Sequence, residues 1–329
     1  MVRCALRMAE HTRIARYFAP LAAGEPGSFA LTDDAALLTP PAGTQLVITT
    51  DSVIEGIHVL PATSPQHFAQ KLMRRNLSDL AAMGATPWRY TLNLHTPRGL
   101  AEDWFEAFAA ALAAEQSTFG LTLVGGDSTS GAARAPIHSS LTCFGLIRSA
   151  PLRRNGAQAG DDLYVSGTIG DAALGLRLLT THRSPLTIHQ PLITRYHTPT
   201  PRLALGTALV GIASAALDIS DGLLADITQL CNASGVGARI ARDAIPRSPE
   251  LQHLLHTNDS IWNDILGGGD DYELAFTAPR VARETIDILA EQGAFLLTRI
   301  GEITAEKNIL LVDGAGNALT TDVTGWQHG

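Results

Sequence analysis

The sequence is poor in cysteine and in long apolar runs, and both shortages exclude classes of protein. Its 329 residues contain only Cys4, Cys143 and Cys231, too few and too widely spaced for a disulfide framework or a C-x-x-C metal site. We therefore expect a reducing, cytoplasmic environment. No apolar run approaches the ~20 residues of a membrane span, and the first residues lack the apolar stretch of a signal peptide. A membrane partner is not expected.

Lysine is also scarce, and this excludes a common nucleotide-binding motif. A P-loop requires Gly-Lys followed by Ser or Thr, whereas Leu72 follows Lys71 and Asn308 follows Lys307. The signatures G-x-G-x-x-G, H-E-x-x-H, G-x-S-x-G and H-x-E…P-C-x-x-C are missing too, which argues against a Rossmann cofactor site, a zincin, an α/β-hydrolase and a zinc deaminase. A Ser-His-Asp triad stays open, because its members need not be close in the chain.

The charge balance argues against a nucleic-acid partner. Acidic residues outnumber basic ones and give a net charge of −8, whereas broad affinity for nucleic acid requires clustered positive charge. A composition of 45% hydrophobic and 17% charged residues is that of an ordinary globular protein. The length favours two domains over one.

Strand-like and helix-like segments alternate along the chain and predict a mixed α and β fold. A strand over Gln45–Thr50, a helix from Pro65 and a strand over Leu121–Val124 illustrate the alternation. Pro, Gly and charged residues interrupt it at Pro151–Gly160, before a new strand-turn-helix series begins at Leu163. We therefore expect domains over residues 1–150 and 151–329.

The helix from Pro65 carries polar residues on its apolar face. Ser64 and Pro65 predict its start, and Gly84 with Pro87 predicts its end. A helical wheel of 100° per residue places Asn76 and Asp79 among the apolar residues. The opposite, polar face carries Gln70, Lys71, Arg74, Arg75 and Ser78. A buried Asp79 requires a metal, a cation or hydrogen-bond donors, so it is either a ligand or a structural aspartate that caps a loop.

Two further helices are predicted to be structural. The segment Ala101–Ala114 reads as a core helix. The helix Leu223–Cys231 has Ser234-Gly235 as its stop signal, and DISDG precedes it.

Aspartates recur in turns after apolar strands and suggest a site for divalent cations. Short carboxylates with neighbouring hydroxyls provide the oxygen ligands that Mg²⁺ requires, although any one Asp-Gly turn could be an ordinary turn. Together these turns would be tolerable only with several cations. The turns contain Asp33-Asp34, Thr49-Thr50-Asp51, Gly125-Gly126-Asp127 and Asp218-Ile219-Ser220-Asp221.

Two glycine-rich segments are predicted to be loops that could approach phosphate. Val124–Asp127 follows a strand, so backbone N–H groups freed by glycine could face phosphate oxygens. Gly267–Asp271 precedes a strand over Tyr272–Thr277, whose alternation suggests that it is half-buried. Ordinary turns remain the alternative for both.

These segments resemble the thiamine-monophosphate kinases, within the wider aminoimidazole ribonucleotide synthetase superfamily. The resemblance runs from about Ala9 to Trp326. Ordered blocks carry it: DDAALL at 33–38, TTDSVIEGIHV at 49–59, NLSDLAAMGATP at 76–87, VGGDST at 124–129, RNGAQAGD at 154–161, DISDGL at 218–223 and GGDDYEL at 268–274.

The resemblance implies an N-terminal α/β domain that binds ATP and Mg²⁺ and forms a homodimer, and a C-terminal α+β domain that closes the active site. It implies metal ligands at Asp34, Thr49, Thr50, Asp51, Asp79, Asp127, Asp218 and Asp221. It implies ATP contacts at Gly126, Asp127, Arg154 and Ser220, and contacts to thiamine monophosphate at His58, Asp270 and Trp326. The family usually has Glu where Asp270 stands, and Ser128 and Asn155 also depart from its pattern. His58 could instead be an ordinary loop residue, and Trp326 a hydrophobic lid.

The expected chemistry is direct in-line transfer from ATP with several Mg²⁺ ions and no catalytic side chain. A phosphate monoester with a second pKa near ~6 is already largely a dianion at neutral pH, so no general base is required. Charge neutralisation and alignment are the tasks that remain. The alternatives are another ATP-using enzyme of the superfamily and a relative that binds nucleotide or metal without turnover.

Overall fold

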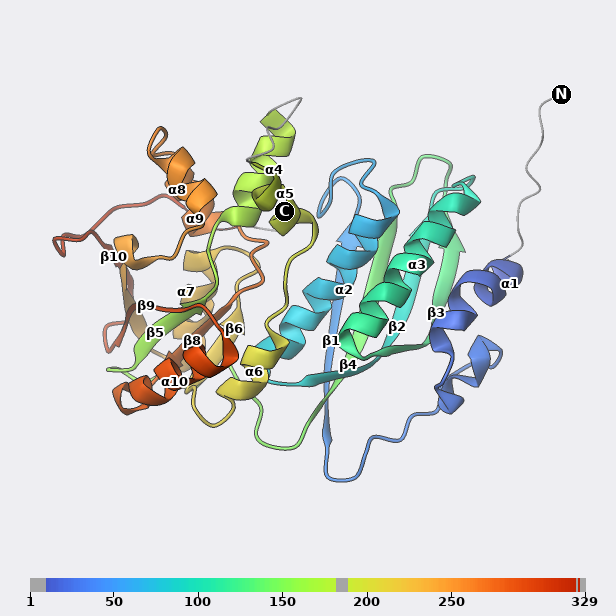
Figure 1. The fold of residues 1–329 in the computed structure, drawn as a ribbon, viewed down its shortest axis with the longest axis horizontal. Coiled ribbons are helices and arrows are strands. Elements are labelled where there is room, and N and C mark those ends of the chain that lie inside the picture. Colours follow the sequence, from blue (N-terminus) through green and yellow to red (C-terminus); the bar gives the residue numbers. More distant parts are fainter. Residues whose placement is uncertain (1–9, 182–188, 324, 326–329) are drawn as a thin grey trace. The chain divides into compact units, whose positions relative to one another are not determined.

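The computed structural model describes residues 10–181, 189–323 and 325 (Figure 1). The chain divides into two compact units. Unit 1 consists of Met1–Leu77 and Thr86–Arg148, and unit 2 of Ser78–Ala85 and Ser149–Gly329. Each unit has its own sheet and is described by itself.

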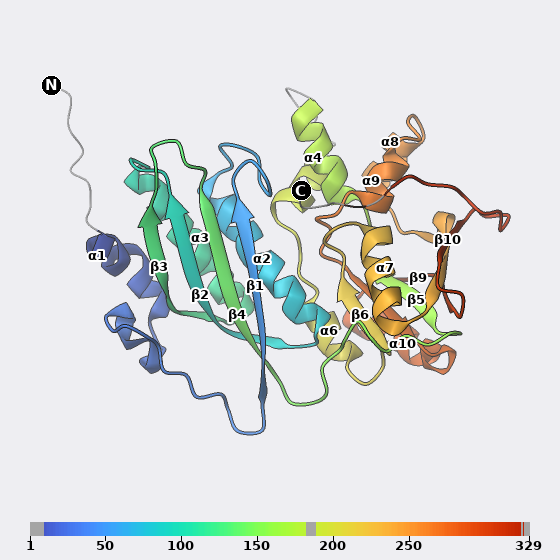
Figure 2. The ribbon, with the colours of Figure 1, turned by 180° about the vertical axis from the view of Figure 1, so that it is seen from behind.

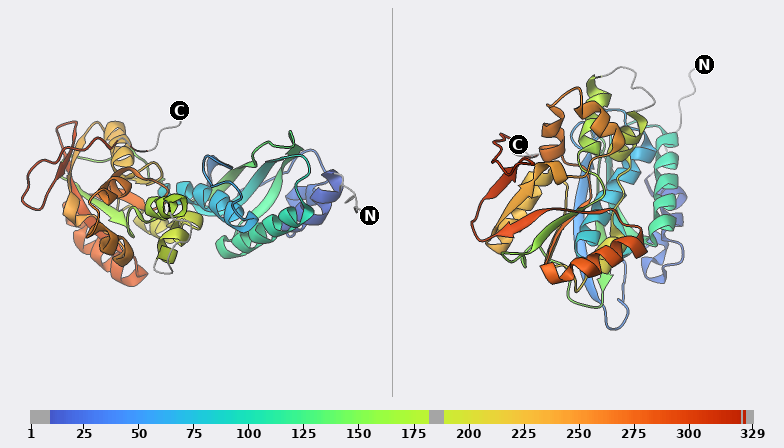
Figure 3. Two further views of the ribbon diagram at one scale, coloured as in Figure 1. Left: turned by 90° about the horizontal axis from the view of Figure 1, so that it is seen from above. Right: turned by 60° about the vertical axis from the view of Figure 1, so that its left-hand side comes forward.

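Unit 1 is a four-stranded sheet with helices on one face. Its strand order is β1-β4-β2-β3, with β1–β4 and β4–β2 antiparallel and β2–β3 parallel. Helices α2 and α3 lie on the same side of the strands in opposite views (Figures 1 and 2) and from above (Figure 3). The elements are α1 (Glu10–Arg13), the short turns η1 (Ile14–Phe18), η2 (Ala19–Ala22) and η3 (Pro26–Leu31), β1 (Gln45–Ile54), α2 (Pro65–Ala82), β2 (Thr86–Thr96), α3 (Glu102–Phe119), β3 (Thr122–Ser130) and β4 (His138–Ile147).

Helix α2 begins where the sequence predicts, and part of its polar face is buried. The Ser64 hydroxyl accepts the His67 N–H, and Gly84 turns the chain with a φ of +71° after the last helical residue. Lys71 and Ser78, on the face opposite the apolar one, are fully buried. A wheel detects one apolar stripe, whereas neighbouring elements cover this helix on more than one side.

The prediction that Val124–Asp127 forms a loop was wrong, because β3 continues through it. Gly126 pairs with Leu92 of β2, and Asp127 pairs with Asn93. Gly126 has a φ of +153°, and a Cβ there would lie 1.8 Å from the Leu92 carbonyl oxygen. Glycine is thus needed at this position for the close approach of two strands.

Unit 2 is a mixed six-stranded sheet in the order β10-β7-β9-β5-β8-β6. Only β10 and β7 pair in parallel. Its strands are β5 (Asp162–Ser166), β6 (Ala215–Asp218), β7 (Gly237–Ala241), β8 (Leu274–Ala278), β9 (Leu297–Thr304) and β10 (Ile309–Val312). Its helices are α4 (Asp171–Thr181), α5 (Gln190–His197), α6 (Leu203–Leu209), α7 (Leu223–Ser234), α8 (Pro249–Leu255), α9 (Ile261–Gly267) and α10 (Arg283–Gly293), with short turns η5 (Arg242–Ala244) and η6 (Arg280–Ala282).

Strand β8 is buried on both faces, which corrects the half-buried strand predicted over Tyr272–Thr277. It lies between β5 and β6 in the sheet. Ala275 packs in one apolar cluster of the unit, and Leu274 and Phe276 pack in another. Successive side chains of β8 therefore point alternately into two apolar cores, and neither face of the strand is exposed to solvent.

Of the two helices predicted to be structural, α3 extends beyond its predicted end and α7 runs to its predicted stop signal. Helix α3 continues to Phe119 and ends at Gly120, whose φ is +71°. Helix α7 ends at Gly235, the predicted stop, with the same left-handed φ of +71°. Cys143 on β4 and Cys231 on α7 are both buried. Across the described residues, no helix is long and apolar enough to span a bilayer.

Candidate functional site

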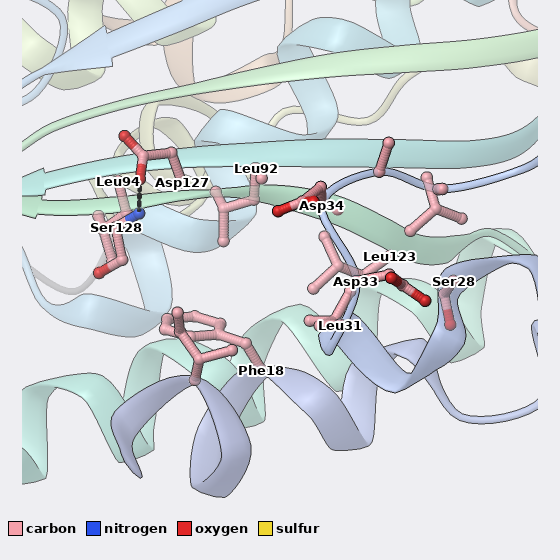
Figure 4. A pocket seen from close by; sticks show the side chains of 16 residues that line it. Phe18, Ser28, Leu31, Asp33, Asp34, Leu92, Leu94, Leu123, Asp127 and Ser128 are labelled. Carbon is pink, nitrogen blue, oxygen red and sulfur yellow. Dashed lines mark hydrogen bonds between the residues drawn. The ribbon is translucent and has the colours of Figure 1, made fainter. Parts of the chain in front are cut away.

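Unit 1 contains a cavity of about 120 Å³ with an apolar interior and acidic residues in its lining. Asp33 and Asp34 come from the segment after η3, and Asp127 comes from β3. Figure 4 shows Asp34 and Asp127 beside the strands and Phe18 on the opposite side of the cavity. The remaining lining is mainly aliphatic and includes Ile14, Leu31, Leu92, Leu94 and Leu123. An apolar wall next to carboxylates can hold an uncharged ring beside a bound cation.

Local backbone geometry sets the positions of these acids. Phe29, Ala30 and Leu31 have φ values of 49°, 55° and 58°, a left-handed run without glycine that ends two residues before Asp33. Such strain is common where a segment is shaped for binding. The Asp127 carboxylate accepts the Ser128 N–H at 2.9 Å. Asp34 and Asp127 are exposed, so their oxygens are accessible to a ligand.

Residues in the middle of α2 hold Asp51 of β1 in a defined position. The Arg75 guanidinium donates to both Asp51 carboxylate oxygens, with Nε–Oδ2 at 3.0 Å and the second contact at 3.3 Å. The Asp51 N–H donates to Asn76 Oδ1 at 3.0 Å. Sequence reasoning noted Asn76 on the apolar face but found no role for Asn76 or Arg75. Their spacing of 24 and 25 residues from Asp51 offers no local signal.

The other sequence-predicted residues of unit 1 lie near the same strand. The Thr50 and Thr142 hydroxyls share a hydrogen bond of 2.8 Å, and Thr49 pairs with Cys143 in the sheet register. His58 Nδ1 accepts the Ile54 N–H at 3.1 Å, so it helps to close the turn after β1. The proton of the neutral imidazole is therefore on Nε2.

Unit 2 gathers four of the predicted residues on two adjoining loops. The first is the DISDG loop (residues 218–222), which connects β6 to α7. The second is the GGDDY loop (residues 268–272), which connects α9 to β8. The Ser220 carbonyl accepts the Asp270 N–H, and the Ile219 carbonyl accepts the Tyr272 N–H, each at 2.8 Å. Asp218, Ser220, Asp221 and Asp270 are therefore neighbours.

Glycines allow this close contact between the two loops. A Cβ on Gly269 would lie 2.4 Å from the Ser220 carbonyl oxygen, and a Cβ on Gly222 would lie 2.7 Å from Gly267. Asp270 has a φ of +62°, and its carboxylate accepts the Tyr272 hydroxyl proton at 2.9 Å. Tyr272 also has a positive φ, of 52°, so the GGDDY loop is strained next to predicted ligands.

Asp218 is a buried carboxylate with a perturbed pKa. Its carboxylate accepts the Ser78 hydroxyl proton at 2.7 Å. The pKa of Asp218 is raised to about 6, mainly by burial and also by the negative charge of Asp226, while the Ser78 hydrogen bond and the Arg154 charge act in the opposite direction. The exposed Arg154 is therefore close enough to influence Asp218.

Two predicted residues fall outside these groups. Asp79 is partly buried in the last turn of α2, in unit 2, and Trp326 lies outside the described residues.

Within residues 10–181, 189–323 and 325, no three His, Cys, Asp or Glu side chains lie close enough together to hold one metal ion. Unit 1 carries Asp34, Thr49, Thr50, Asp51 and Asp127, and unit 2 carries Asp79, Asp218 and Asp221.

A buried ionic cluster lies behind the GGDDY loop, and sequence reasoning did not find it. Glu273 is fully buried, and its carboxylate accepts hydrogen bonds from Arg195, Arg202 and the Ser166 hydroxyl. Arg195 also donates to the Asp271 carbonyl oxygen at 3.1 Å. The Glu273 carbonyl oxygen accepts the Ile219 N–H at 2.8 Å, so this cluster supports both loops.

Comparisons with known proteins agree with this architecture. Residues 32–147 match the family model of the AIR synthase related protein N-terminal domain, and residues 158–313 match that of the C-terminal domain. The thiamine-monophosphate kinase of Salmonella typhimurium is 40% identical over 327 residues, which cover 97% of this chain and 98% of that protein.

Solved structures give the same result. The crystal structure of thiamine-monophosphate kinase from Stenotrophomonas maltophilia K279a has a TM-score of 0.79 and 41% identity, and covers 88% of this chain and 91% of that one. The structure of AaThiL complexed with AMPPCP and TMP has a TM-score of 0.77 and 29% identity, and covers 90% and 91%. The chain, with its two predicted domains of α/β and α+β character, therefore belongs to the thiamine-monophosphate kinase family of AIR synthase related proteins.

Proposed function

We propose that this protein transfers the γ-phosphoryl group of ATP to thiamine monophosphate and releases thiamine diphosphate and ADP. The observation that carries the proposal is the 40% identity to a thiamine-monophosphate kinase over nearly the full length of both chains. A second support is the related structure of AaThiL in complex with AMPPCP, an ATP analogue, and TMP.

The reaction is a direct in-line displacement. A phosphate oxygen of thiamine monophosphate attacks the γ-phosphorus, a new P–O bond forms, and the bond to the oxygen shared with the β-phosphate breaks. Because the attacking phosphate is already largely dianionic, no side chain has to remove a proton. The protein must align two anions that repel each other, which is the main task in phosphoryl transfer.

The candidate ligands suit magnesium. They are carboxylates and hydroxyls, the hard oxygen donors that Mg²⁺ binds, and Asp34 and Asp127 present exposed carboxylates in the lining of one cavity. Bound Mg²⁺ would neutralise the phosphates and orient them. In this proposal the ions are held by Asp34, Thr49, Thr50, Asp51, Asp79, Asp127, Asp218 and Asp221.

The remaining contacts divide between the two substrates. Gly126 and Asp127, which line the cavity of unit 1, contact ATP together with Arg154 and Ser220 of unit 2. His58, Asp270 and Trp326 contact thiamine monophosphate. Asp270 is one methylene shorter than the Glu usual in the family, so it reaches the ligand either through a water molecule or not at all.

The N-terminal domain also forms a homodimer in this proposal. The support is β1, an edge strand of the sheet in unit 1 that exposes Leu46 and Ile48. Exposed apolar side chains on an edge strand favour pairing with another chain. Residues 1–150 then bind ATP and Mg²⁺ and dimerise, and residues 151–329 provide the other contacts. Ile48→Lys should shift the mass measured by light scattering from dimer to monomer, and a monomeric unmodified protein would refute the dimer.

The activity is tested by incubating the purified protein with ATP, Mg²⁺ and thiamine monophosphate and measuring ADP and thiamine diphosphate by chromatography. Both products should appear in equal amounts and only with Mg²⁺. Asp127→Asn should abolish them, whereas Asp103→Asn, an exposed charge change on α3, should not. ADP without thiamine diphosphate would indicate another ATP-using enzyme of the superfamily. Nucleotide binding without either product would indicate a non-catalytic relative.

A further inference from the structure

Asp226 makes an unusual set of contacts with the DISDG loop. It lies in the first turns of α7, and its side chain is buried. One carboxylate oxygen, Oδ2, accepts the N–H groups of Ser220, Asp221 and Gly222 at 2.9, 2.9 and 3.2 Å. Three consecutive amides thus converge on one atom, which fixes the backbone from which Asp221 projects.

The second loop is attached to the first. The Ser220 carbonyl accepts the Asp270 N–H, and the Ile219 carbonyl accepts the Tyr272 N–H. The peptide units that donate to Asp226 therefore belong to the same short segment that holds the GGDDY loop in place. A change at Asp226 would be transmitted to both loops, because the DISDG loop, which contacts both Asp226 and the GGDDY loop, is only five residues long.

We propose that Asp226 is a positioning residue that sets the geometry of Asp221, Ser220 and Asp270 for the binding of metal and substrates. This inference rests on the proposed function and adds a residue to it. Asp226 itself touches neither reactant. Its buried carboxylate gives charge-assisted hydrogen bonds, which are roughly twice as strong as neutral ones. Outer partners of this kind commonly change metal affinity or activity by 10- to 100-fold when they are removed.

A merely structural role would have different consequences, and Asp171 provides the matched control. Asp171 is a buried aspartate at the start of α4 in the same unit, and it accepts the hydroxyl protons of Thr168 and Ser248 at 2.5 and 2.6 Å. Neither hydroxyl partner belongs to the DISDG or the GGDDY loop, so removal of Asp171 should lower stability while the three hydrogen bonds to Asp226 stay in place.

The experiment compares Asp226→Ala, Asp226→Asn and Asp171→Asn with the unmodified protein in two measurements. Amide hydrogen exchange, followed by mass spectrometry without ligands, reports the protection of residues 220–222 and 270–272. Calorimetry with MgATP reports affinity. Asp226→Ala should speed exchange in both segments and weaken MgATP binding by about 10- to 100-fold. Asp226→Asn keeps an oxygen acceptor without its charge, so its loss should be smaller, at most about 10-fold. Asp171→Asn should leave both readouts within twofold.

Several outcomes would overturn the proposal. One is unchanged exchange in the two segments of Asp226→Ala. Another is that Asp171→Asn weakens MgATP binding as much as the Asp226 variants do while it lowers stability to a similar extent. If Asp226→Ala does not fold, Asp226→Asn decides by the same criteria. Exchange needs no turnover, so a protein that fails to make thiamine diphosphate would refute the proposed function while leaving this inference open to its own result.

Discussion

Replacing Glu273 with glutamine should lower the free energy of unfolding of unit 2 by about 3 kcal/mol. Glu273 is fully buried, and two arginines and a serine donate to its carboxylate. Glutamine has nearly the same size, so the change removes the negative charge that pairs with both guanidinium groups. The structure therefore isolates an electrostatic effect with little change in packing.

The magnitude follows from the burial of the partners. Breaking a fully buried ion pair by removing one charge costs about 3–5 kcal/mol. The side chains of Arg195 and Arg202 remain 19% and 29% exposed, so water partly solvates them and the lower end applies. In a unit of this size, 1 kcal/mol corresponds to about 2–4 °C, so the midpoint should fall by about 6–12 °C.

The assay is chemical denaturation followed by circular dichroism, together with the fluorescence of Trp262, which lies in unit 2. Glu302→Gln is the matched control, because Glu302 pairs with Arg280 at 2.9 Å while these two side chains are 41% and 57% exposed. That variant should change stability by less than about 0.5 kcal/mol. A loss below about 1 kcal/mol in Glu273→Gln, or an equal loss in both variants, would refute the reasoning.

Three further predictions concern the site, pH and packing. Asp127→Asn should nearly abolish turnover. The thermal midpoint should stay unchanged or rise, because the substitution removes an exposed negative charge near other acids. A variant that keeps at least half of the wild-type kcat at saturating Mg²⁺ would contradict this prediction. Hydrogen bonds from Arg283 lower the pKa of Asp162 despite its burial. The ionised Asp162 therefore stabilises the folded state fully above its unfolded pKa of ~4, and this contribution is lost as the pH falls through the lower folded pKa. Asp162→Asn should therefore lower the thermal midpoint at pH 7, with a difference that shrinks towards pH 3, and a constant difference would be evidence against this linkage. Gly206→Ala should lower the free energy of unfolding by about 1–3 kcal/mol, because a Cβ at this position would lie 1.9 Å from the Ala81 carbonyl oxygen. An unchanged midpoint of thermal denaturation would exclude so close a contact.

Local signals in the sequence predicted local structure well. Ser64 and Pro65 gave the start of α2, and Gly235 gave the end of α7, because caps and left-handed turns depend on residues that adjoin them in the chain. The class of fold followed from the alternation of such segments, and the family from ordered motifs.

Features that depend on tertiary partners were predicted poorly. Glycines at Val124–Asp127 suggested a loop, yet pairing with β2 continues β3 through them. The wheel placed Ser78 on the polar face and gave it no partner, yet it donates to Asp218, 140 residues further along the chain. Asp226 read as an ordinary helix residue, because only the folded loop shows that three amides point towards it.

The positions of two cysteines allow the opening of each unit to be followed separately. Cys143 lies on β4 of unit 1 with no exposed surface, and Cys231 lies on α7 of unit 2 at 2% exposure. Burial raises the pKa of the Cys231 thiol to about 11, which slows alkylation of the closed state further. With Cys4 replaced by serine, a thiol reagent would modify each of these two sites only when its own unit opens, so labelling rates give two opening free energies from one sample. Mass spectrometry of the two peptides, with and without MgATP, would then show whether the nucleotide stabilises one unit or both.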